Sequence, residues 1–171
     1  KVNSKSGQVL KSWKEEATTD QDTIMNWFSN TDYNIGVRTG NGLLVIDVDN
    51  KKGKNGYQSI EPFLKNFPKT LVVKTANNGW HMYYYVDSRI SCKVGLYEAI
   101  DIRGEGGYVV GAESVIENKK YFISFDSPIA HANDTVYQFL EKNTKPTKVD
   151  LMVDYIHEGE RNNYLFKIGC F

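Results

Sequence analysis

The segment that most constrains the fold is an apolar run that ends in two aspartates. Residues 43–49 read Leu-Leu-Val-Ile-Asp-Val-Asp, and they follow directly on Asn41-Gly42. An apolar run of this length after a turn signal is typical of a strand buried on both faces, and Asn-Gly is the dipeptide that most favours a type I′ turn. The chain therefore has to build a sheet around residues 43–49. We expect residues 34–40 to form the other strand of a hairpin with them.

Further segments supply strands for this sheet. Alternating apolar residues bounded by turn residues predict strands at 70–76, 81–86, 100–103 and 108–111. The first two of these are joined by the tight turn Asn77-Asn78-Gly79-Trp80. A small hairpin is expected around Asn118-Lys119, with residues 115–116 and 121–123 as its strands. The sheet is therefore expected to contain several antiparallel pairs.

Helices are predicted between and after these strands. Thr19 with Asp22 forms a capping box for a helix over about 20–30, and an apolar face from Tyr57 to Phe67 predicts a second helix that begins late or kinks at Pro62. Two helices should close the chain, one capped by Asp134 and one running from the capping box at 147–150 to about residue 159. Interspersed strands and helices favour an α/β (α+β) fold over an all-helical one.

Composition limits the class of protein. The chain has 171 residues, 40% of them hydrophobic, which suits one globular domain of ordinary core size. Its 21 basic and 21 acidic residues cancel, so the overall field does not steer the chain toward a polyanion. Two cysteines give neither a disulfide framework nor a Cys-rich zinc site. With no apolar run of about 20 residues and no signal-peptide core, we expect a cytoplasmic chain without membrane contact.

Asp47 and Asp49 point to metal chemistry. They lie two residues apart on one strand, so their side chains project from the same face of the sheet. Two neighbouring carboxylates repel each other, and a divalent cation such as Mg²⁺ removes that conflict while leaving positions open for phosphates. The alternative interpretation is a strand end whose acids simply meet solvent.

Asp101 repeats the pattern on a second apolar segment, Ile100-Asp101-Ile102-Arg103. Three acids on apolar strands suit a site for two Mg²⁺ or Mn²⁺ ions that serves nucleotidyl transfer. The alternative is a surface pair between Asp101 and Arg103, which share a face as residues i and i+2. Because the three carboxylates would repel one another, we expect their replacement by alanine to leave stability unchanged or higher.

Nucleotide contacts are expected next to these acids. His81 opens a strand directly after a glycine-containing turn, where the imidazole and the backbone amides of Asn78 and Gly79 can face a phosphate. Arg103 can present a fork of donors to phosphate oxygens. The alternatives are a histidine that hydrogen-bonds within the sheet and an arginine that is solvated. The basic run from Lys51 to Lys54 is interpreted mainly as a solvated loop.

The order of these motifs resembles the primase-polymerase domain of the archaeo-eukaryotic primase superfamily, as found in replication proteins of plasmids, phages and mobile elements. The resemblance covers most of the chain. It is carried by Trp13, by Ala17 to Asp20, and by residues 34–40, 43–49, 68–70, 75–84, 100–110 and 158–162.

The resemblance implies roles for the site residues. It assigns the catalytic metals to Asp47, Asp49 and Asp101, and phosphate contact to His81. It also implies an α/β unit packed on a sheet like that of RNA-recognition modules, with the site in the cleft between them. The turn differs from the family's frequent Ser-Gly-Gly, because this chain has Asn77-Asn78-Gly79. The Cys/His cluster of some relatives is missing, so no zinc is expected.

We therefore expect a DNA primase or DNA-directed polymerase that uses a single-stranded DNA template, a primer and dNTPs or NTPs. The catalytic domain is expected over residues 1–157, and residues 158–171 should begin a helical C-terminal region or a linker of a larger protein that is fused to, or works with, a helicase. Because the chain carries no net charge, its own hold on the template should be weak. Two alternatives stay open: a metal-dependent nucleotide-sugar glycosyltransferase, which also uses an Asp-x-Asp pair, and a non-catalytic nucleic-acid-binding module.

Overall fold

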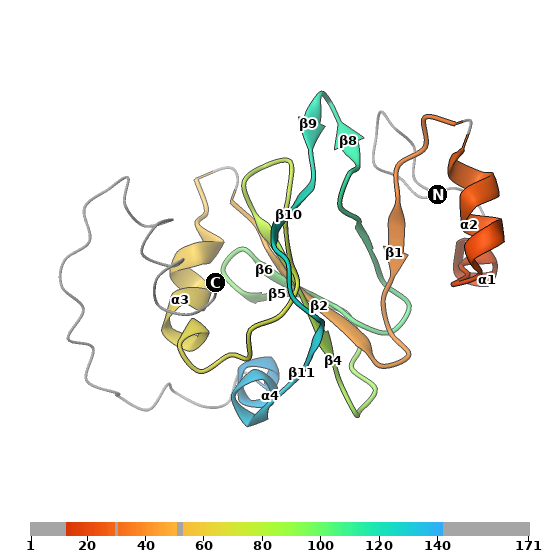
Figure 1. Ribbon diagram of the computed structural model, residues 1–171. Coiled ribbons are helices and arrows are strands. Elements are labelled where there is room, and N and C mark those ends of the chain that lie inside the picture. The colour runs from red at the N-terminus through yellow and green to blue at the C-terminus, as the bar shows by residue number, and fades with distance from the viewer. Residues whose placement is uncertain (1–12, 30, 51–52, 142–171) are drawn as a thin grey trace.

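The centre of the protein is a seven-stranded sheet, and the strand that carries Asp47 lies inside it, with neighbours on both sides. The structure, a computed structural model, describes residues 13–29, 31–50 and 53–141 (Figure 1). Along the sheet the order is β10 (Phe122–Phe125), β3 (Val72–Lys74), β4 (Trp80–Tyr85), β2 (Leu43–Val48), β6 (Ile100–Arg103) and β5 (Lys93–Tyr97), and β11 (Ala130–His131) pairs with β4. All these pairs are antiparallel except β11 with β4. β2 is therefore a central strand, as its apolar sequence predicts.

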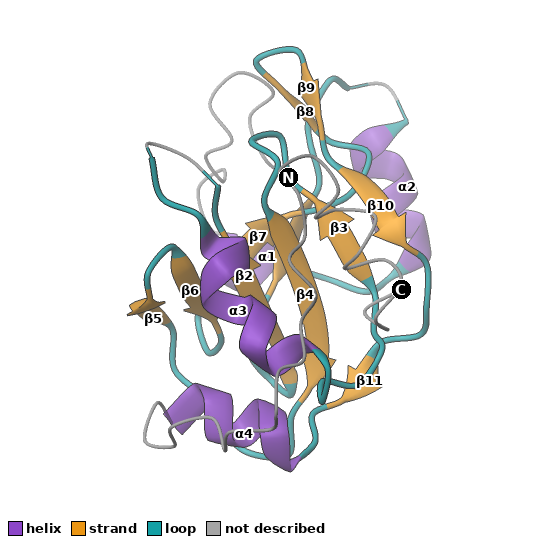
Figure 2. Cartoon of the chain, turned by 90° about the vertical axis from the view of Figure 1, so that its left-hand side faces the viewer, coloured by secondary structure: helices purple, strands orange, loops and turns teal. Residues whose placement is uncertain are grey.

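Two helices cover one face of this sheet. They are α3 (Gly56–Leu64) and α4 (Asp134–Glu141), which Figure 2 shows in front of the strands. The main hydrophobic core lies between them and the sheet, and it contains the fully buried Leu44, Ile46 and Val48 of β2. Each such side chain contributes roughly 1.5–3 kcal/mol through burial. This packing fixes which face of β2 meets the helices, and so which face carries Asp47.

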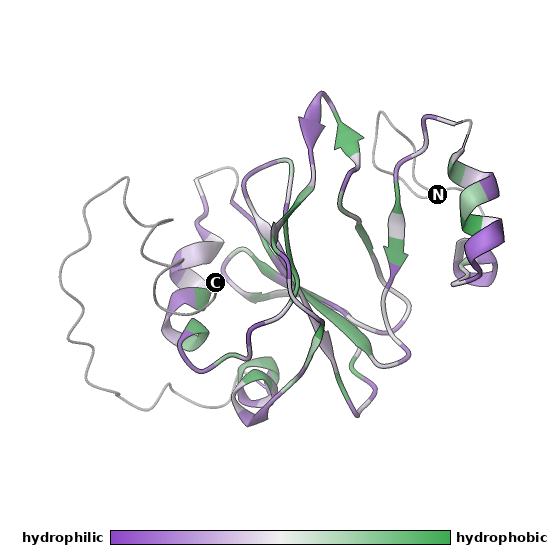
Figure 3. Cartoon of the chain, viewed as in Figure 1, coloured by the Kyte–Doolittle hydropathy of each residue, from purple (hydrophilic) through white to green (hydrophobic). Residues whose placement is uncertain are grey.

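The opposite face of the sheet packs against smaller elements. The strand pair of β1 (Gly36–Arg38) with β7 (Tyr108–Val110) lies there, and α1 (Trp13–Glu16) and α2 (Gln21–Phe28) lie on the far side of β1 (Figure 1). A further hairpin is formed by β8 (Val115–Ile116) and β9 (Lys119–Lys120). A second, smaller core joins Val45, Val73 and Tyr83 of the sheet to Val109 of β7. In Figure 3 the hydrophobic residues gather on the strands of the central sheet, whereas β9 is hydrophilic.

The expected hairpin of residues 34–49 is wrong in its pairing. The turn forms, because Asn41 and Gly42 both have positive φ and the Gly40 and Leu43 backbones exchange two hydrogen bonds. The strands then part, and β1 pairs with β7 while β2 pairs with β4 and β6. Thr39 explains the departure, since its amide donates to the Gly107 carbonyl and its hydroxyl donates to the Gly104 carbonyl.

Several element boundaries also differ from the predictions. Asp20, not Thr19, caps α2, because its carboxylate accepts from the Thr23 amide, and Asn133, not Asp134, plays this part for α4. Pro62 lies on the exposed side inside α3, which starts before it. The small hairpin is closed by β9, while the expected strand 121–123 continues as β10 into the main sheet. β5 and β11 were not predicted.

The expected last helix and the boundary at residue 157 lie outside the described residues. None of the helices that the structure describes is long and apolar enough to cross a membrane.

Candidate active site

Three polar side chains form a row across three neighbouring strands. In the antiparallel ladders, Asp47 of β2 lies directly opposite His81 of β4 on one side and Asp101 of β6 on the other. Residues that are directly opposite in neighbouring strands project from the same face of a sheet. The row His81–Asp47–Asp101 therefore lies on the face away from α3 and α4. Sequence alternation predicted a common face for Asp47 and Asp49, whereas the alignment of Asp47 with Asp101 follows from the register of β2 and β6.

Asp49 is held immediately beyond the end of β2. Its amide donates to the Ala99 carbonyl at 2.8 Å, and its own carbonyl accepts from the Gly56 amide at 2.9 Å. These bonds anchor its backbone between the start of β6 and the start of α3. Asp49 acts electrostatically on the same tyrosine as Asp47: burial raises the pKa of Tyr121, and the charges of Asp47 and Asp49 raise it further. The structure thus brings Asp49 to the neighbourhood of the row.

Arg103 connects the two aligned aspartates. Its Nε and Nη2 donate to Oδ2 of Asp47 at 3.2 and 3.0 Å, and Nη2 also donates to Oδ2 of Asp101 at 2.8 Å. The surface pair of Asp101 and Arg103 considered from the sequence is therefore present, but it extends across the strands to Asp47. The contact of Arg103 with Asp47 follows from the register of β2 and β6, which places Arg103 opposite Val45, two residues from Asp47.

This bridge argues against the expectation that replacing the acids would leave stability unchanged or higher. Burial alone would raise the pKa of the Asp47 carboxyl, but the hydrogen bond and charge of His81 and the guanidinium of Arg103 outweigh it, so the pKa lies below its ordinary value. Burial likewise would lower the pKa of Arg103, whereas Asp47 and Asp101 raise it. Attraction to Arg103 outweighs repulsion between the carboxylates, so removing Asp47 should destabilise the fold.

His81 is buried beside Asp47. Its Nε2 lies 3.5 Å from Oδ1 of Asp47, and its ring centroid lies 5.9 Å from that of Tyr121. Its other ring nitrogen, Nδ1, is buried and has no hydrogen-bond partner among the described residues. A buried polar atom of this kind calls for a partner, and a ligand oxygen that accepts or donates a proton would serve.

Two tyrosines lie within the electrostatic reach of Asp47, and sequence reasoning gave Tyr121 no role. Burial raises the pKa of Tyr83, and the charge of Asp47 raises it further, so the phenol stays neutral. Tyr121 comes from the connection between β9 and β10. Residue type and spacing gave no signal for Tyr121, because its approach depends on the path of that connection.

The turn before His81 uses its backbone amides internally. The Asn78 amide donates to the Thr75 carbonyl at 3.1 Å, and the Gly79 amide donates to Thr75 Oγ1 at 2.9 Å. The expected contact of these two amides with a phosphate is therefore not available in this turn, and Asn78 retains only its exposed side chain for that role. The Asn78 carbonyl accepts from the hydroxyl of Tyr57, which ties the turn to α3.

Gly79 is required by close packing. A Cβ at this position would lie 2.2 Å from the Val48 carbonyl oxygen and 2.9 Å from Thr75 Oγ1. The turn therefore rests directly on the end of β2, one residue before Asp49. Glycine thus positions His81 and the side chain of Asn78 beside the acids, although it makes no ligand contact through its own amide.

The carboxylates have the chemistry of a magnesium or manganese site. Hard divalent ions take carboxylate oxygens; Asp47 and Asp101 offer them on one face, and Asp49 lies just beyond the end of β2. Within the described ranges, however, no group of three or more His, Cys, Asp and Glu side chains is already gathered as a metal ion would require. Arg103 lies between Asp47 and Asp101 instead. The carboxylates therefore have the donor type that a divalent ion takes, and the guanidinium of Arg103 bridges two of them.

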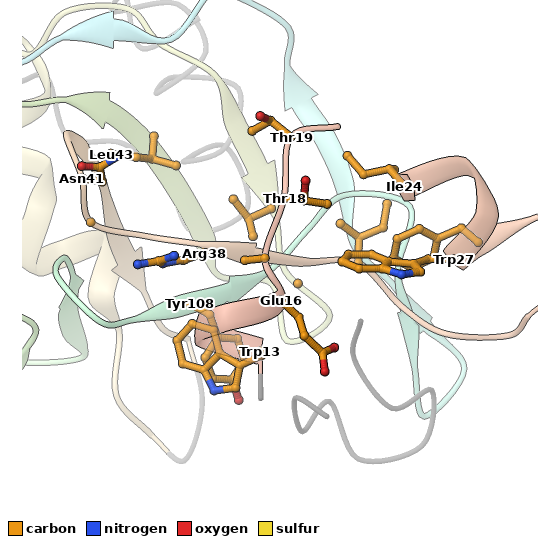
Figure 4. A pocket seen from close by; sticks show the side chains of 16 residues that line it. Trp13, Glu16, Thr18, Thr19, Ile24, Trp27, Arg38, Asn41, Leu43 and Tyr108 are labelled. Carbon is orange, nitrogen blue, oxygen red and sulfur yellow. The ribbon is translucent and has the colours of Figure 1, made fainter. Parts of the chain in front are cut away.

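A separate hollow lies on the far side of β1. It has a volume of about 690 Å³ and is enclosed by α1, α2 and β1 (Figure 4). Trp13 packs on Tyr108 there at 5.2 Å between ring centroids, and Arg38 donates to the Lys14 carbonyl at 3.0 Å. The acids described above do not line it. We assign this hollow no part in the chemistry.

The fold and the site together define a mixed α/β protein with an acidic site on one face of an antiparallel sheet. The family described as bifunctional DNA primase/polymerase, N-terminal (Prim-Pol), matches residues 3–135. The match covers most of the chain, so the protein belongs to this family, as the order of its motifs predicted. Membership supports a nucleotidyltransferase of the primase or polymerase type. No curated protein matches the chain.

Proposed function

We propose that this chain is the catalytic unit of a DNA-templated primase-polymerase that uses two divalent ions, Mg²⁺ or Mn²⁺. The observation that carries the proposal is the row His81–Asp47–Asp101 on one face of the central strand, together with Asp49 just beyond it. The ligands of the ions are Asp47, Asp49 and Asp101. Bound ions would activate the 3′-hydroxyl of the primer and neutralise the triphosphate and the leaving pyrophosphate.

The remaining polar residues orient the incoming nucleotide in this proposal. His81 directs its Nδ1 toward a phosphate of the nucleotide, which would satisfy that buried nitrogen. Oδ1 of Asp47, which faces Nε2 of His81, holds the orientation of the imidazole. Asn78 adds its exposed side-chain amide from the turn, and Arg103 adds a guanidinium near the same phosphates.

The proposal also covers the setting of the site. The nucleic acid, a single-stranded DNA template with its primer, would lie beside the acids, in the cleft that the family resemblance implies between an α/β unit and an RNA-recognition-module-like sheet. dNTPs or NTPs are the second substrate. Replication of a plasmid, phage or other mobile element is the process that such an activity would serve, in the cytoplasm and together with a helicase.

The test is extension of a labelled primer on a DNA template with dNTPs and Mg²⁺ or Mn²⁺. Asp47→Asn, Asp49→Asn and Asp101→Asn should each reduce incorporation by at least about a hundredfold, since each removes a charged ligand. Asp87→Asn is the matched control, because Asp87 is an exposed carboxylate after β4. Thermal midpoints identify any variant that is inactive because it is unfolded.

The same preparations separate the proposal from its alternatives. Incubation with sugar nucleotides tests for the release of nucleoside diphosphate, which a glycosyltransferase would produce and a primase-polymerase would not. Incorporation near the wild-type level by the folded variants of all three acids would refute the metal assignment. Template binding without any incorporation, by wild-type protein with either metal, would favour a non-catalytic module.

A further inference from the structure

Protein groups face all four carboxylate oxygens of the two aligned aspartates, and three of these oxygens accept hydrogen bonds. Oδ2 of Asp47 and Oδ2 of Asp101 accept from the guanidinium of Arg103, at 2.8 to 3.2 Å. Oδ1 of Asp101 accepts from the Gly95 amide at 2.8 Å, and Oδ1 of Asp47 faces His81 Nε2 at 3.5 Å. The oxygens that metal coordination requires are therefore engaged by protein groups, and the only cationic side chain that joins both carboxylates in the described residues is Arg103.

We propose that Arg103 is an internal counterion that occupies the metal-free site and is exchanged for the divalent ion. The proposal rests on the function proposed above, because it concerns the same carboxylates. A guanidinium can donate hydrogen bonds to two carboxylates at once, and it supplies one positive charge. A divalent ion supplies two positive charges at the same oxygens. The guanidinium and the ion compete for Oδ2 of both acids, so binding of the ion is linked to release of Arg103.

The local structure allows this exchange without rearranging the sheet. Arg103 is the last residue of β6, whose backbone is paired with β2. Its side chain is partly exposed, so the guanidinium can turn toward solvent by rotation about side-chain bonds alone. Arg103 is in this sense a positioning residue. Its positive charge offsets the repulsion between the carboxylates of Asp47 and Asp101 until the ion binds.

The released guanidinium gives the exchange a consequence for the nucleotide. Freed from Asp47 and Asp101, it stays beside the site and can pair with a phosphate that arrives with the ion. Metal binding and phosphate binding are then coupled through one side chain. Removing Arg103 should therefore act in opposite directions on the two ligands, tightening the metal and weakening the nucleotide.

The test compares the wild-type chain with Arg103→Gln, Arg103→Lys and the control Arg38→Gln, which removes an exposed guanidinium from β1. Binding of Mn²⁺ alone, without nucleotide, is followed by electron paramagnetic resonance. We expect Arg103→Gln to bind Mn²⁺ about tenfold more tightly, since the ion no longer has to displace a partly exposed ion pair. Arg103→Lys, a point charge without a fork, should fall between them, and Arg38→Gln should match the wild type.

Thermal midpoints provide a second readout that does not depend on activity. Arg103→Gln without metal should melt lower than the wild type, because Asp47 and Asp101 then repel each other, and Mn²⁺ should raise its midpoint by more than it raises that of the wild type. With saturating Mn²⁺, the same variant should bind dNTP more weakly. An arginine with only a phosphate role would leave the affinity for Mn²⁺ alone unchanged.

The outcomes separate this inference from the proposed function. If the wild type binds Mn²⁺ and extends primers but Mn²⁺ affinity is equal or weaker in folded Arg103→Gln, the counterion role is overturned and the function stands. If the wild type neither binds Mn²⁺ nor extends primers, both are overturned. Should Arg103→Gln fail to fold, Arg103→Lys decides the matter, and tighter Mn²⁺ binding than in the wild type is the required result.

Discussion

The bridge from Arg103 to the two aspartates makes the stability of Asp47→Asn a direct test of the site's electrostatics. The substitution keeps the shape of the side chain and removes its charge. Arg103 then loses one of its two carboxylate partners, and His81 loses the carboxylate next to Nε2. If repulsion between carboxylates dominated the site, this variant would gain stability. The observed contacts predict a loss.

The magnitude follows from burial and from the partner that remains. The side chain of Asp47 is 13% exposed and that of Arg103 is 31% exposed, so the pair is neither a surface pair nor a fully buried one. Breaking a buried pair costs about 3–5 kcal/mol, and an exposed pair contributes about 0.2–1 kcal/mol. Because Asp101 still holds Arg103 at 2.8 Å, we expect Asp47→Asn to lower the free energy of unfolding by about 1–2 kcal/mol.

Urea unfolding at pH 7, without divalent ions, measures this loss. The comparison requires equal m-values, so that a shift of the midpoint reports stability and not a change in the unfolded state. Asp87→Asn should lie within about 0.5 kcal/mol of the wild type. A double-mutant cycle of Asp47→Asn with Arg103→Gln should give a coupling energy of about 1 kcal/mol. Zero coupling, or a variant more stable than the wild type, would refute the reasoning.

Three further predictions follow from the same contacts. His81 and Arg103 hold the pKa of Asp47 below its ordinary value. As the pH falls below about 4, the Asp47 carboxylate is therefore protonated in the unfolded chain before it is protonated in the folded one. The stability that the ionised carboxylate contributes is full above that pH and is lost on further acidification. Asp47→Asn should therefore flatten the urea midpoint between about pH 5 and 2.5, and parallel curves would contradict the assignment. Gly79→Ala places a methyl group 2.2 Å from the Val48 carbonyl oxygen and should cost about 2–3 kcal/mol, whereas Gly106→Ala, at positive φ in open space, should cost about 1 kcal/mol in the same unfolding assay. His81→Ala should weaken binding of dNTP, measured with saturating Mn²⁺, more than binding of primer-template, because its Nδ1 is proposed to face a phosphate of the nucleotide; equal losses in both titrations would argue against this role.

Local sequence patterns predicted the parts of the fold that depend on alternation and turns. The apolar run of β2, the turn at Asn41-Gly42 and the strands on both sides of Gly79 are visible because side-chain direction in a strand has a period of two and because glycine permits positive φ. The same alternation placed Asp47 and Asp49 on one face. These predictions concern neighbours in sequence, and the structure confirms the strand and the turns.

The choice of strand partners was not predictable in this way. Residues 34–40 were expected to pair with β2 because the turn between them is a hairpin turn, yet β1 pairs with β7. The decision depends on hydrogen bonds from Thr39 to Gly104 and Gly107, which lie more than sixty positions further along the chain. A turn fixes the path of two residues, whereas long-range contacts decide which strand lies beside which.

The connection between Asp47 and Arg103 has the same origin. Spacing within one strand suggested that Arg103 pairs with Asp101, and it does, but the contact with Asp47 exists only because Arg103 is opposite Val45. A shift of one residue in the ladder would turn every side chain of β6 to the other face. Neither the sequence of β2 nor that of β6, taken separately, specifies the register between them, so the contact of Arg103 with Asp47 was not predictable from either.

What does specify the register lies on the other face of the sheet. Ile46 is opposite both Met82 and Ile102, and Val48 is opposite both Trp80 and Ile100, and all of them are buried under α3 and α4. A one-residue slip of β2 would bury Asp47 in that core and expose Ile46 and Val48, at a cost of several kcal/mol for each misplaced group. The hydrophobic face therefore aligns the carboxylates on the polar face, although it does not touch them. In the proposed exchange the carboxylates therefore stay in register, and Arg103 is the group that moves.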